Sequence, residues 1–354
     1  MENSTLPFMR PLRLGELLDQ AIRIYRRNFV SFIGILALAY IPYALLTLFS
    51  SWLSLSSGLS AIQATSARNP FALFSSPGYW LSIVLSLVSG AVYLILLNGI
   101  ATSALVNNIL RNQLGQKTGI LDSYRQIGPF WWKITITLIL YTLLMLAAFV
   151  WLIVPCVGWI SGLGLIFFLG TIVGQILPAI VIIEKMNGIE AITRAWDMAR
   201  RRFWWLVGFA IIFALFNILV VLGPTYLVRY LLSSLVFKSA SLDATVMSTM
   251  IASIVSAVLH LLILPIQITA WTLVYFDLRI RSEGFDLAVS ALDPASENLV
   301  EDIANIPPAP GISKWLNGDD IGRFVIISLV GLGAYALIVG IVFIITYASI
   351  SALR

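Results

Sequence analysis

Hydrophobic residues in this chain fall into seven long runs separated by shorter polar segments. A helix needs about 20 apolar residues to cross the hydrocarbon core of a bilayer, and every run reaches that length. The runs cover about residues 30–53, 79–106, 134–154, 158–183, 204–228, 249–276 and 324–348. The pattern therefore predicts an all-α integral membrane protein with about seven transmembrane helices.

The third and fourth runs are separated only by a bend around Pro155, Val157 and Gly158. The alternative is one continuous tilted helix. Such a helix would contain about 50 residues, which is far more than a bilayer can hold. We therefore expect a tight hairpin between two separate transmembrane helices.

Amphipathic segments precede three of the runs. Residues 188–205, GIEAITRAWDMARRRFWW, place apolar side chains at helical spacing and charged side chains on the remaining positions. Residues 12–29 and 119–133 have a similar pattern. Each segment predicts a helix lying on a membrane face, with arginines at the lipid headgroups and indoles at the interface. The residues predicted to contact headgroups or the interface are Arg26, Arg27, Arg200, Arg201, Arg202, Trp204 and Trp205.

The three amphipathic segments suggest an internal repeat. Each unit would contain a surface helix, an outward span, a connection and a returning span, over about residues 12–106, 119–183 and 188–287. Units with the same orientation should surround an axis near the membrane normal. The alternative is that any basic amphipathic segment before a span gives this pattern. We expect residues 1–287 to form one six-helix membrane domain of three parallel repeats.

The basic residues predict the orientation. Four segments, 1–29, 107–133, 184–203 and 277–323, hold 18 of the 22 lysines and arginines. Because cytoplasmic loops are enriched in these residues, the N-terminus is predicted to be cytoplasmic and the C-terminus to lie outside. No cleavable signal sequence is expected, since the first long run begins at Val30 after a charged segment. The predicted location is the cell membrane, with multiple passes.

The last part of the chain differs in composition. Residues 288–322 are rich in acidic residues and contain the proline-rich stretch IPPAPG, which predicts a flexible cytoplasmic linker. Residues 323–354 contain the seventh run, in which Gly331, Gly333, Ala336 and Gly340 would permit close helix contact. We expect this helix to dock on the six-helix domain or on a neighbouring membrane protein.

Composition narrows the possible classes of protein. Hydrophobic residues make up 59% of the chain and charged residues 11%, which is too apolar for a soluble protein of this length. The net charge of +5 reflects membrane topology, so no nucleic-acid partner is expected. With Cys156 as its one cysteine, the sequence predicts no disulfide, no metal site and no cofactor. Aspartate, glutamate, lysine and arginine are absent from the interior of the runs, which argues against a proton pump.

The only histidine, His260, lies near the middle of the sixth run. An intramembrane histidine can bond to a neighbouring helix, relay a proton or ligate a porphyrin metal. We expect the interhelical hydrogen bond, with Asn98, Gln175, Asn217 and Gln267 as candidate partners. His260, Gln175 and Asn217 form the predicted intramembrane polar site.

Three segments carry a resemblance to a known family. They are RPLRLGELLDQAIRIYRRNF at 10–29, IEAITRAWDMARRRFWW at 189–205 and YFDLRIRSEGFDL at 275–287. Together they resemble the glycerophosphoryl diester phosphodiesterase membrane-domain family of bacteria and archaea, over about residues 10–287. Some members also carry a phosphodiesterase barrel that uses paired histidines, for which this chain has neither the length nor the histidines. The resemblance thus implies a stand-alone member without the catalytic barrel, in a bacterial cell membrane.

The sequence contains no catalytic constellation, so we expect no enzyme activity. The favoured hypothesis is an accessory or scaffolding subunit that engages lipid headgroups, with other membrane proteins contacting its last span and linker. One alternative is a transporter or flippase for an amphipathic substrate, which requires a cavity lined by Gln175, Asn217 or His260. The other is a cofactor-binding subunit of an energy-transducing complex, which would use His260.

Overall fold

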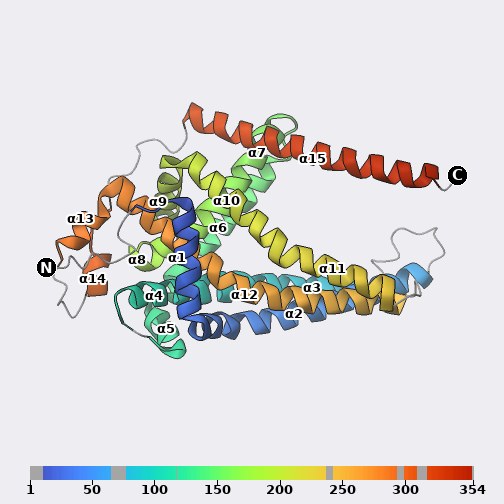
Figure 1. Ribbon diagram of the computed structural model, residues 1–354, viewed down its shortest axis with the longest axis horizontal. Helices are drawn as coiled ribbons and strands as arrows, with labels where there is room; N and C mark the ends of the chain where they lie inside the picture. Colours follow the sequence, from blue (N-terminus) through green and yellow to red (C-terminus); the bar gives the residue numbers. More distant parts are fainter. Residues whose placement is uncertain are drawn as a thin grey trace.

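The computed structural model describes residues 11–64, 77–116, 118–236, 242–292, 299–308 and 317–352 (Figure 1). These residues form helices and connecting turns, without a β-strand. Seven helical segments among them are long and apolar enough to cross a membrane, namely Phe29–Ser56, Pro77–Gln113, Ile120–Trp151, Val157–Ile183, Phe203–Ser234, Ala244–Glu283 and Gly318–Leu337. The prediction of an all-α protein with seven candidate spans is confirmed.

Most of the spans are built from long α-helices. They are α2 (Phe29–Ala64), α3 (Pro77–Val92), α4 (Thr102–Gln113), α6 (Trp131–Trp151), α7 (Val157–Phe168), α8 (Gly174–Ile183), α10 (Phe203–Asn217), α11 (Gly223–Leu231), α12 (Leu242–Glu283) and α15 (Gly318–Ala352). Three π-helical segments, Tyr93–Ala101, Leu169–Val173 and Ile218–Leu222, join α3 to α4, α7 to α8 and α10 to α11. Each of these three spans is therefore continuous but locally widened.

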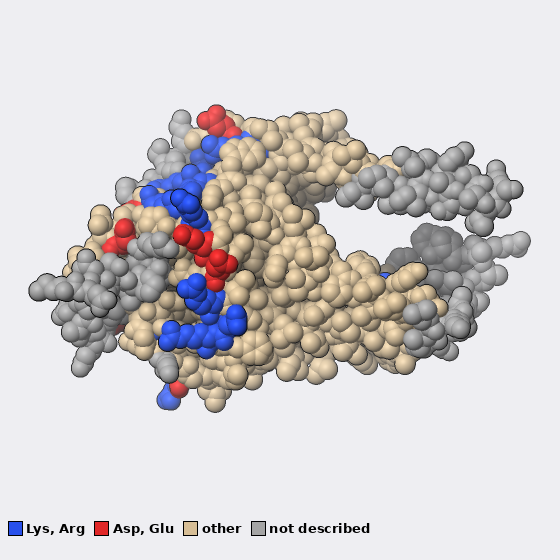
Figure 2. Space-filling model, in the orientation of Figure 1, with Lys and Arg blue, Asp and Glu red and all other residues tan. Residues whose placement is uncertain are grey.

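Shorter helices gather at one end of the molecule, which we call the charged end (Figure 1). They are α1 (Leu14–Arg27), α5 (Ile120–Ile127), α9 (Gly188–Arg201), α13 (Phe285–Ser290) and α14 (Leu299–Ala304). In Figure 2 the charged side chains form a band across this end, while the visible surface of the long helices is almost free of them. Separation of charged and apolar surface along the long axis is what a bilayer requires.

Helix α1 crosses the long axis at the charged end (Figure 1). Its apolar face buries Leu17 and Ala21 against the body, while Arg26 and Arg27 are exposed on the opposite side. The Tyr25 hydroxyl donates a 3.0 Å hydrogen bond to the Leu262 carbonyl of α12, so α1 is anchored to the sixth span. This arrangement fits the amphipathic pattern of its sequence.

Helix α9 differs from the helix predicted for residues 188–205. It packs against α6, α8 and α12, and most of its side chains are buried, including Arg194, Trp196 and Arg200. The expectation that this segment lies on a membrane face is therefore wrong. The physical reason is that acidic side chains from other helices pair with its arginines, which allows a charged helix to be enclosed.

The connection between α6 and α7 is a short turn over residues 152–156, so the predicted hairpin is confirmed. Gly158 makes the tight turn possible, because a Cβ atom at this position would lie 2.2 Å from the Trp151 carbonyl oxygen. Only glycine permits this approach.

The seventh span docks on the six-helix body through the beginning of α15. Ser328 accepts a 2.7 Å hydrogen bond from the Gly164 amide of α7, and Phe324 packs against Phe168. A Cβ atom at Gly164 would lie 2.1 Å from the Phe324 carbonyl oxygen. The small residue that permits the close contact between α7 and α15 is therefore Gly164 of α7. The predicted contact glycines of α15, Gly331, Gly333 and Gly340, have open space around them among the described residues.

The predicted linker over 288–322 is partly folded, because α14 lies within it and α15 begins at Gly318. Ile303 of α14 is fully buried, and Asp320 at the start of α15 is 3% exposed. Residues 293–298 and 309–316 lie outside the described part of the chain. The expectation of a solvated acidic spacer is therefore wrong for Asp320, which has an arginine partner.

Candidate functional site

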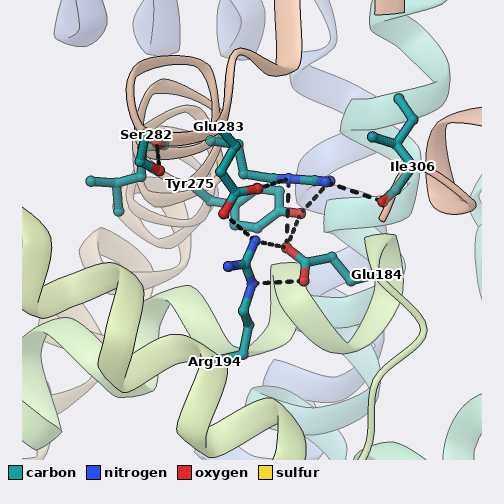
Figure 3. Close-up of polar contacts among 8 residues, drawn as sticks. Glu184, Arg194, Tyr275, Ser282, Glu283 and Ile306 are labelled. Carbon is teal, nitrogen blue, oxygen red and sulfur yellow. Dashed lines mark hydrogen bonds and ion pairs between the residues drawn. The ribbon is translucent and has the colours of Figure 1, made fainter. Parts of the chain in front are cut away.

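Five side chains form a buried ion cluster where α8, α9 and α12 meet (Figure 3). They are Glu184, Arg194, Tyr275, Arg279 and Glu283, and the four charged side chains are at most 6% exposed. Arg194 Nε lies 3.0 Å from Glu184 Oε2, and Arg279 Nε lies 3.2 Å from Glu283 Oε2. The Tyr275 hydroxyl donates a 2.9 Å hydrogen bond to Glu184.

The ion cluster has equal numbers of carboxylates and guanidinium groups. Burial lowers the pKa of Arg194, but the attraction of Glu184 and Glu283 outweighs this effect and raises the pKa above its usual value. Arg279 also donates to the Ile306 carbonyl at 3.3 Å, just after α14. The cluster therefore joins four helical segments of the charged end and leaves no excess charge.

A second ionic group, which we call the Asp277 site, contains Asp277, Arg202, Arg281 and the backbone of Leu12. The Asp277 carboxylate accepts hydrogen bonds from the Leu12 amide at 2.9 Å, from Arg281 Nε at 2.9 Å and from Arg202 Nη1 at 3.0 Å. Arg281 Nη2 donates to the Leu12 carbonyl at 2.8 Å. Two arginines thus share one buried carboxylate, and Asp277 and Arg281 hold Leu12 near the beginning of the described chain.

A third group fixes α15 on α9. Arg200 Nη2 lies 2.8 Å from Asp320 Oδ2, and both side chains are 4% exposed. Arg323 lies 3.6 Å from the other Asp320 oxygen. The buried pair explains why the beginning of the seventh span lies against α9 and α7.

The residues predicted to contact headgroups or the interface differ in their exposure. Arg26, Arg27 and Trp204 are exposed, while Arg201, Arg202 and Trp205 are partly exposed. Arg200 is buried, so the prediction that it contacts lipid headgroups is wrong. Asp320, 120 positions away along the chain, satisfies its charge, and no local sequence pattern indicates that pairing.

Polar side chains also line three neighbouring spaces among the spans. An inner cavity of about 80 Å³ lies between α4, α8 and α12, and a side cleft of about 320 Å³ lies between α8, α10 and α12. A larger space of about 430 Å³, which we call the hydroxyl groove, lies between α2, α11 and α12. His260 lines both the inner cavity and the hydroxyl groove, and Gln175 lines both the inner cavity and the side cleft.

The predicted polar residues line these neighbouring spaces. Gln267 Nε2 donates a 3.3 Å hydrogen bond to Gln175 Oε1, and Asn217 lines the side cleft beside both glutamines. The His260 ring stacks on Tyr40, with 5.9 Å between the ring centroids. Among the described residues His260 makes no hydrogen bond, so the predicted interhelical bond is wrong. Stacking on the tyrosine holds the ring in its place.

Hydroxyl side chains predominate in the hydroxyl groove, among them Thr47, Ser51, Thr249, Ser253 and Ser256, with Arg229 near one end. Several hydroxyls bond to the backbone of their own helix, as Ser253 does to the Thr249 carbonyl at 2.8 Å. The Thr249 hydroxyl oxygen is buried and has no partner among the described residues. The groove therefore offers polar groups between helices that are long and apolar enough to cross a membrane.

The three π-helical segments border the inner cavity and the side cleft. Tyr93 and Asn98 belong to the first, Gly170 and Thr171 to the second, and Ile218 to the third. Such segments widen a helix locally and occur frequently at functional sites. Sequence analysis did not predict them, because apolar π-helical turns have the same composition as the α-helices around them.

The fold and these polar spaces define an all-α, multi-pass membrane protein. No protein-family model, curated protein or solved structure matches the chain. The resemblance to the glycerophosphoryl diester phosphodiesterase membrane-domain family therefore stays a prediction. In the described residues, no group of three or more histidine, cysteine, aspartate or glutamate side chains is placed to hold a metal ion.

Proposed function

We propose that this protein binds an amphipathic molecule in the hydroxyl groove and moves its polar head past His260 and Gln175. The observation that carries the proposal is that His260 and Gln175 each line two of three neighbouring polar-lined spaces. The transporter or flippase hypothesis required such a cavity lined by the predicted polar residues.

The size and lining of the groove support a lipid-like ligand. Ligand sites in proteins usually enclose about 300 to 1,000 Å³, and the hydroxyl groove, at about 430 Å³, lies within this range. An unpaired polar group inside a membrane destabilises the folded protein by on the order of several kcal/mol. A partner that forms a hydrogen bond with the group removes this cost. A polar head with acceptor atoms would satisfy the Thr249 hydroxyl, His260 and Arg229, while apolar tails occupy the surrounding lipid.

The accessory-subunit hypothesis receives less support. It depended on basic helices at the membrane surface, and the structure instead encloses α9 and pairs Arg200 with Asp320. We retain from that hypothesis the proposed orientation, in which the charged end faces the cytoplasm and the chain resides in the cell membrane. The excess of basic residues at this end supports that orientation.

The test blocks the groove with a large side chain. Ser253→Trp places an indole in the groove, whereas Ile254→Trp changes the next residue, whose side chain is 50% exposed on the outer face of α12. Purified variants are placed in liposomes containing fluorescent phospholipids, and lipid movement between leaflets is measured by chemical quenching.

We expect the original protein and Ile254→Trp to move lipid at similar rates, and Ser253→Trp to lose most of this activity. Mass spectrometry of lipids that copurify with each variant provides the second measurement. The proposal is wrong if no lipid moves and copurifying lipids are the same in all three proteins.

A further inference from the structure

The Asp277 site has more positive charge than its buried carboxylate requires. The Asp277 side chain is fully buried, and Arg281 alone contacts both of its oxygens, at 2.9 and 3.0 Å. The Leu12 amide adds another donor at 2.9 Å. Arg281 alone balances the charge of this carboxylate. The second guanidinium, from Arg202, is therefore a surplus cation.

Both guanidinium groups also reach the surface. The Arg202 and Arg281 side chains are 29% and 33% exposed. Arg202 uses Nη1 for Asp277, and Arg281 uses Nε for Asp277 and Nη2 for Leu12. The remaining donors, Arg202 Nε and Nη2 and Arg281 Nη1, make no hydrogen bond to any described residue. Three nitrogen atoms, which carry five N–H groups on two neighbouring cations, are thus available to an anion.

The two arginines also affect each other. Burial is the first cause that lowers the pKa of Arg202, and the positive charge of Arg281 is the second. A bound anion would relieve this repulsion. The Arg202 guanidinium lies over the Trp205 ring at 4.7 Å, which holds it in one orientation without using its remaining donors.

The location of the site indicates where the anion would come from. Arg202 is the single residue between α9 and α10, and the apolar span of α10 begins at the next residue, Phe203. The exposed Trp204 follows two positions after Arg202 in the chain. Tryptophan and arginine at the start of a span are typical of the level of the lipid headgroups.

We propose that Arg202 and Arg281 form a binding site for the phosphate group of an anionic lipid headgroup. Planar guanidinium groups match phosphate oxygens through paired hydrogen bonds, which lysine cannot reproduce. Asp277 positions both guanidinium groups, and Trp205 orients Arg202. This site lies at the charged end, apart from the hydroxyl groove, and it does not depend on the proposed movement of lipid.

The test measures lipid binding by the delipidated full-length protein with native mass spectrometry. The probes are phosphatidic acid, phosphatidylglycerol and phosphatidylcholine, each with the same acyl chains. Arg202→Gln removes the surplus charge while Arg281 and Leu12 continue to satisfy Asp277. Arg23→Gln is the matched control, because it removes one exposed positive charge from α1 at the same end of the molecule, at a residue not predicted to contact headgroups. Arg202→Lys keeps the charge and removes the planar group.

We expect the two anionic lipids to bind more tightly than phosphatidylcholine, and Arg202→Gln to weaken their binding about tenfold, as for the loss of a charge-assisted hydrogen bond. Arg202→Lys should show a smaller loss and Arg23→Gln less than a twofold change. Equal weakening by Arg202→Gln and Arg23→Gln would mean that the surface charge as a whole attracts anions, and the site would be rejected.

A second arm identifies the source of the phosphate. Inorganic phosphate is added to the original protein and to Arg202→Gln, and the midpoint of thermal unfolding is measured. Stabilisation of the original protein by inorganic phosphate alone, without selective binding of anionic lipid, would assign the site to a free phosphate compound and overturn the lipid assignment. The absence of both effects would overturn the site itself. Neither readout measures lipid movement, so failure here is distinguishable from failure of the proposed function.

Discussion

The ion cluster of α8, α9 and α12 and the hydroxyl groove are both rich in polar groups, but they satisfy these groups differently. In the ion cluster Glu184 pairs with Arg194, and Arg279 pairs with Glu283. In the groove, the Thr249 hydroxyl has no partner among the described residues, and the His260 ring stacks on Tyr40 without a hydrogen bond. Polar groups that are paired within the protein stabilise the fold, whereas groups that lack partners remain available for a ligand.

The largest effect should come from the ion cluster. Arg279→Met leaves Glu184, Glu283 and the Ile306 carbonyl without the guanidinium, and an uncompensated buried charge costs about 3 to 5 kcal/mol. We expect a large decrease in the midpoint of thermal unfolding in detergent, or no folded protein. Arg27→Met, at an exposed position of α1, is the control and should change the midpoint little. Similar midpoints for the two variants would show that the cluster does not stabilise the fold.

A smaller effect is expected where α15 docks on α7. Gly164→Ala would place a methyl group 2.1 Å from the Phe324 carbonyl oxygen, so the beginning of α15 has to move away. Gly208→Ala in α10 adds the same methyl group where nothing lies within 4 Å. Hydrogen exchange of residues 318–328 should become faster in Gly164→Ala only. Unchanged exchange in this variant would contradict the close packing of α7 and α15.

The smallest effect is expected in the hydroxyl groove. Thr249→Val removes a buried hydroxyl without a described partner, so stability should stay the same or increase slightly. Thr269→Val on the same helix removes a 2.7 Å hydrogen bond to the Pro265 carbonyl and should cost about 1 kcal/mol. Unfolding midpoints of the two variants check this difference. A larger loss for Thr249→Val would mean that its hydroxyl is satisfied in the folded protein.

Sequence periodicity was sufficient to predict the membrane fold, because the length of an apolar run is a local property. The seven spans and the hairpin between α6 and α7 follow from such runs, and the short turn agrees with Gly158. The same reasoning predicts Gln175, Asn217 and His260 in one polar site, whereas in the structure Gln175 and His260 line the inner cavity and Gln175 and Asn217 line the side cleft. The internal repeat stays a prediction.

The errors concern pairings between residues far apart in the sequence. An arginine on an amphipathic helix has the same local pattern whether it contacts lipid or a buried carboxylate. The sequence predicts Arg200 at the surface, because nothing near it in the sequence indicates that Asp320 is its partner. For the same reason the sequence predicts a flexible linker over residues 288–322, although Asp320 is buried.

The contact of Leu12 with Asp277 and Arg281 has a consequence for the order of assembly. These partners are separated by 265 and 269 positions in the chain. At about 5 to 20 residues per second, a ribosome needs roughly 13 to 54 s to make the intervening segment. Leu12 therefore cannot form these hydrogen bonds until nearly the whole six-helix body has been synthesised. The contact that fixes Leu12 forms only at a late stage of biogenesis.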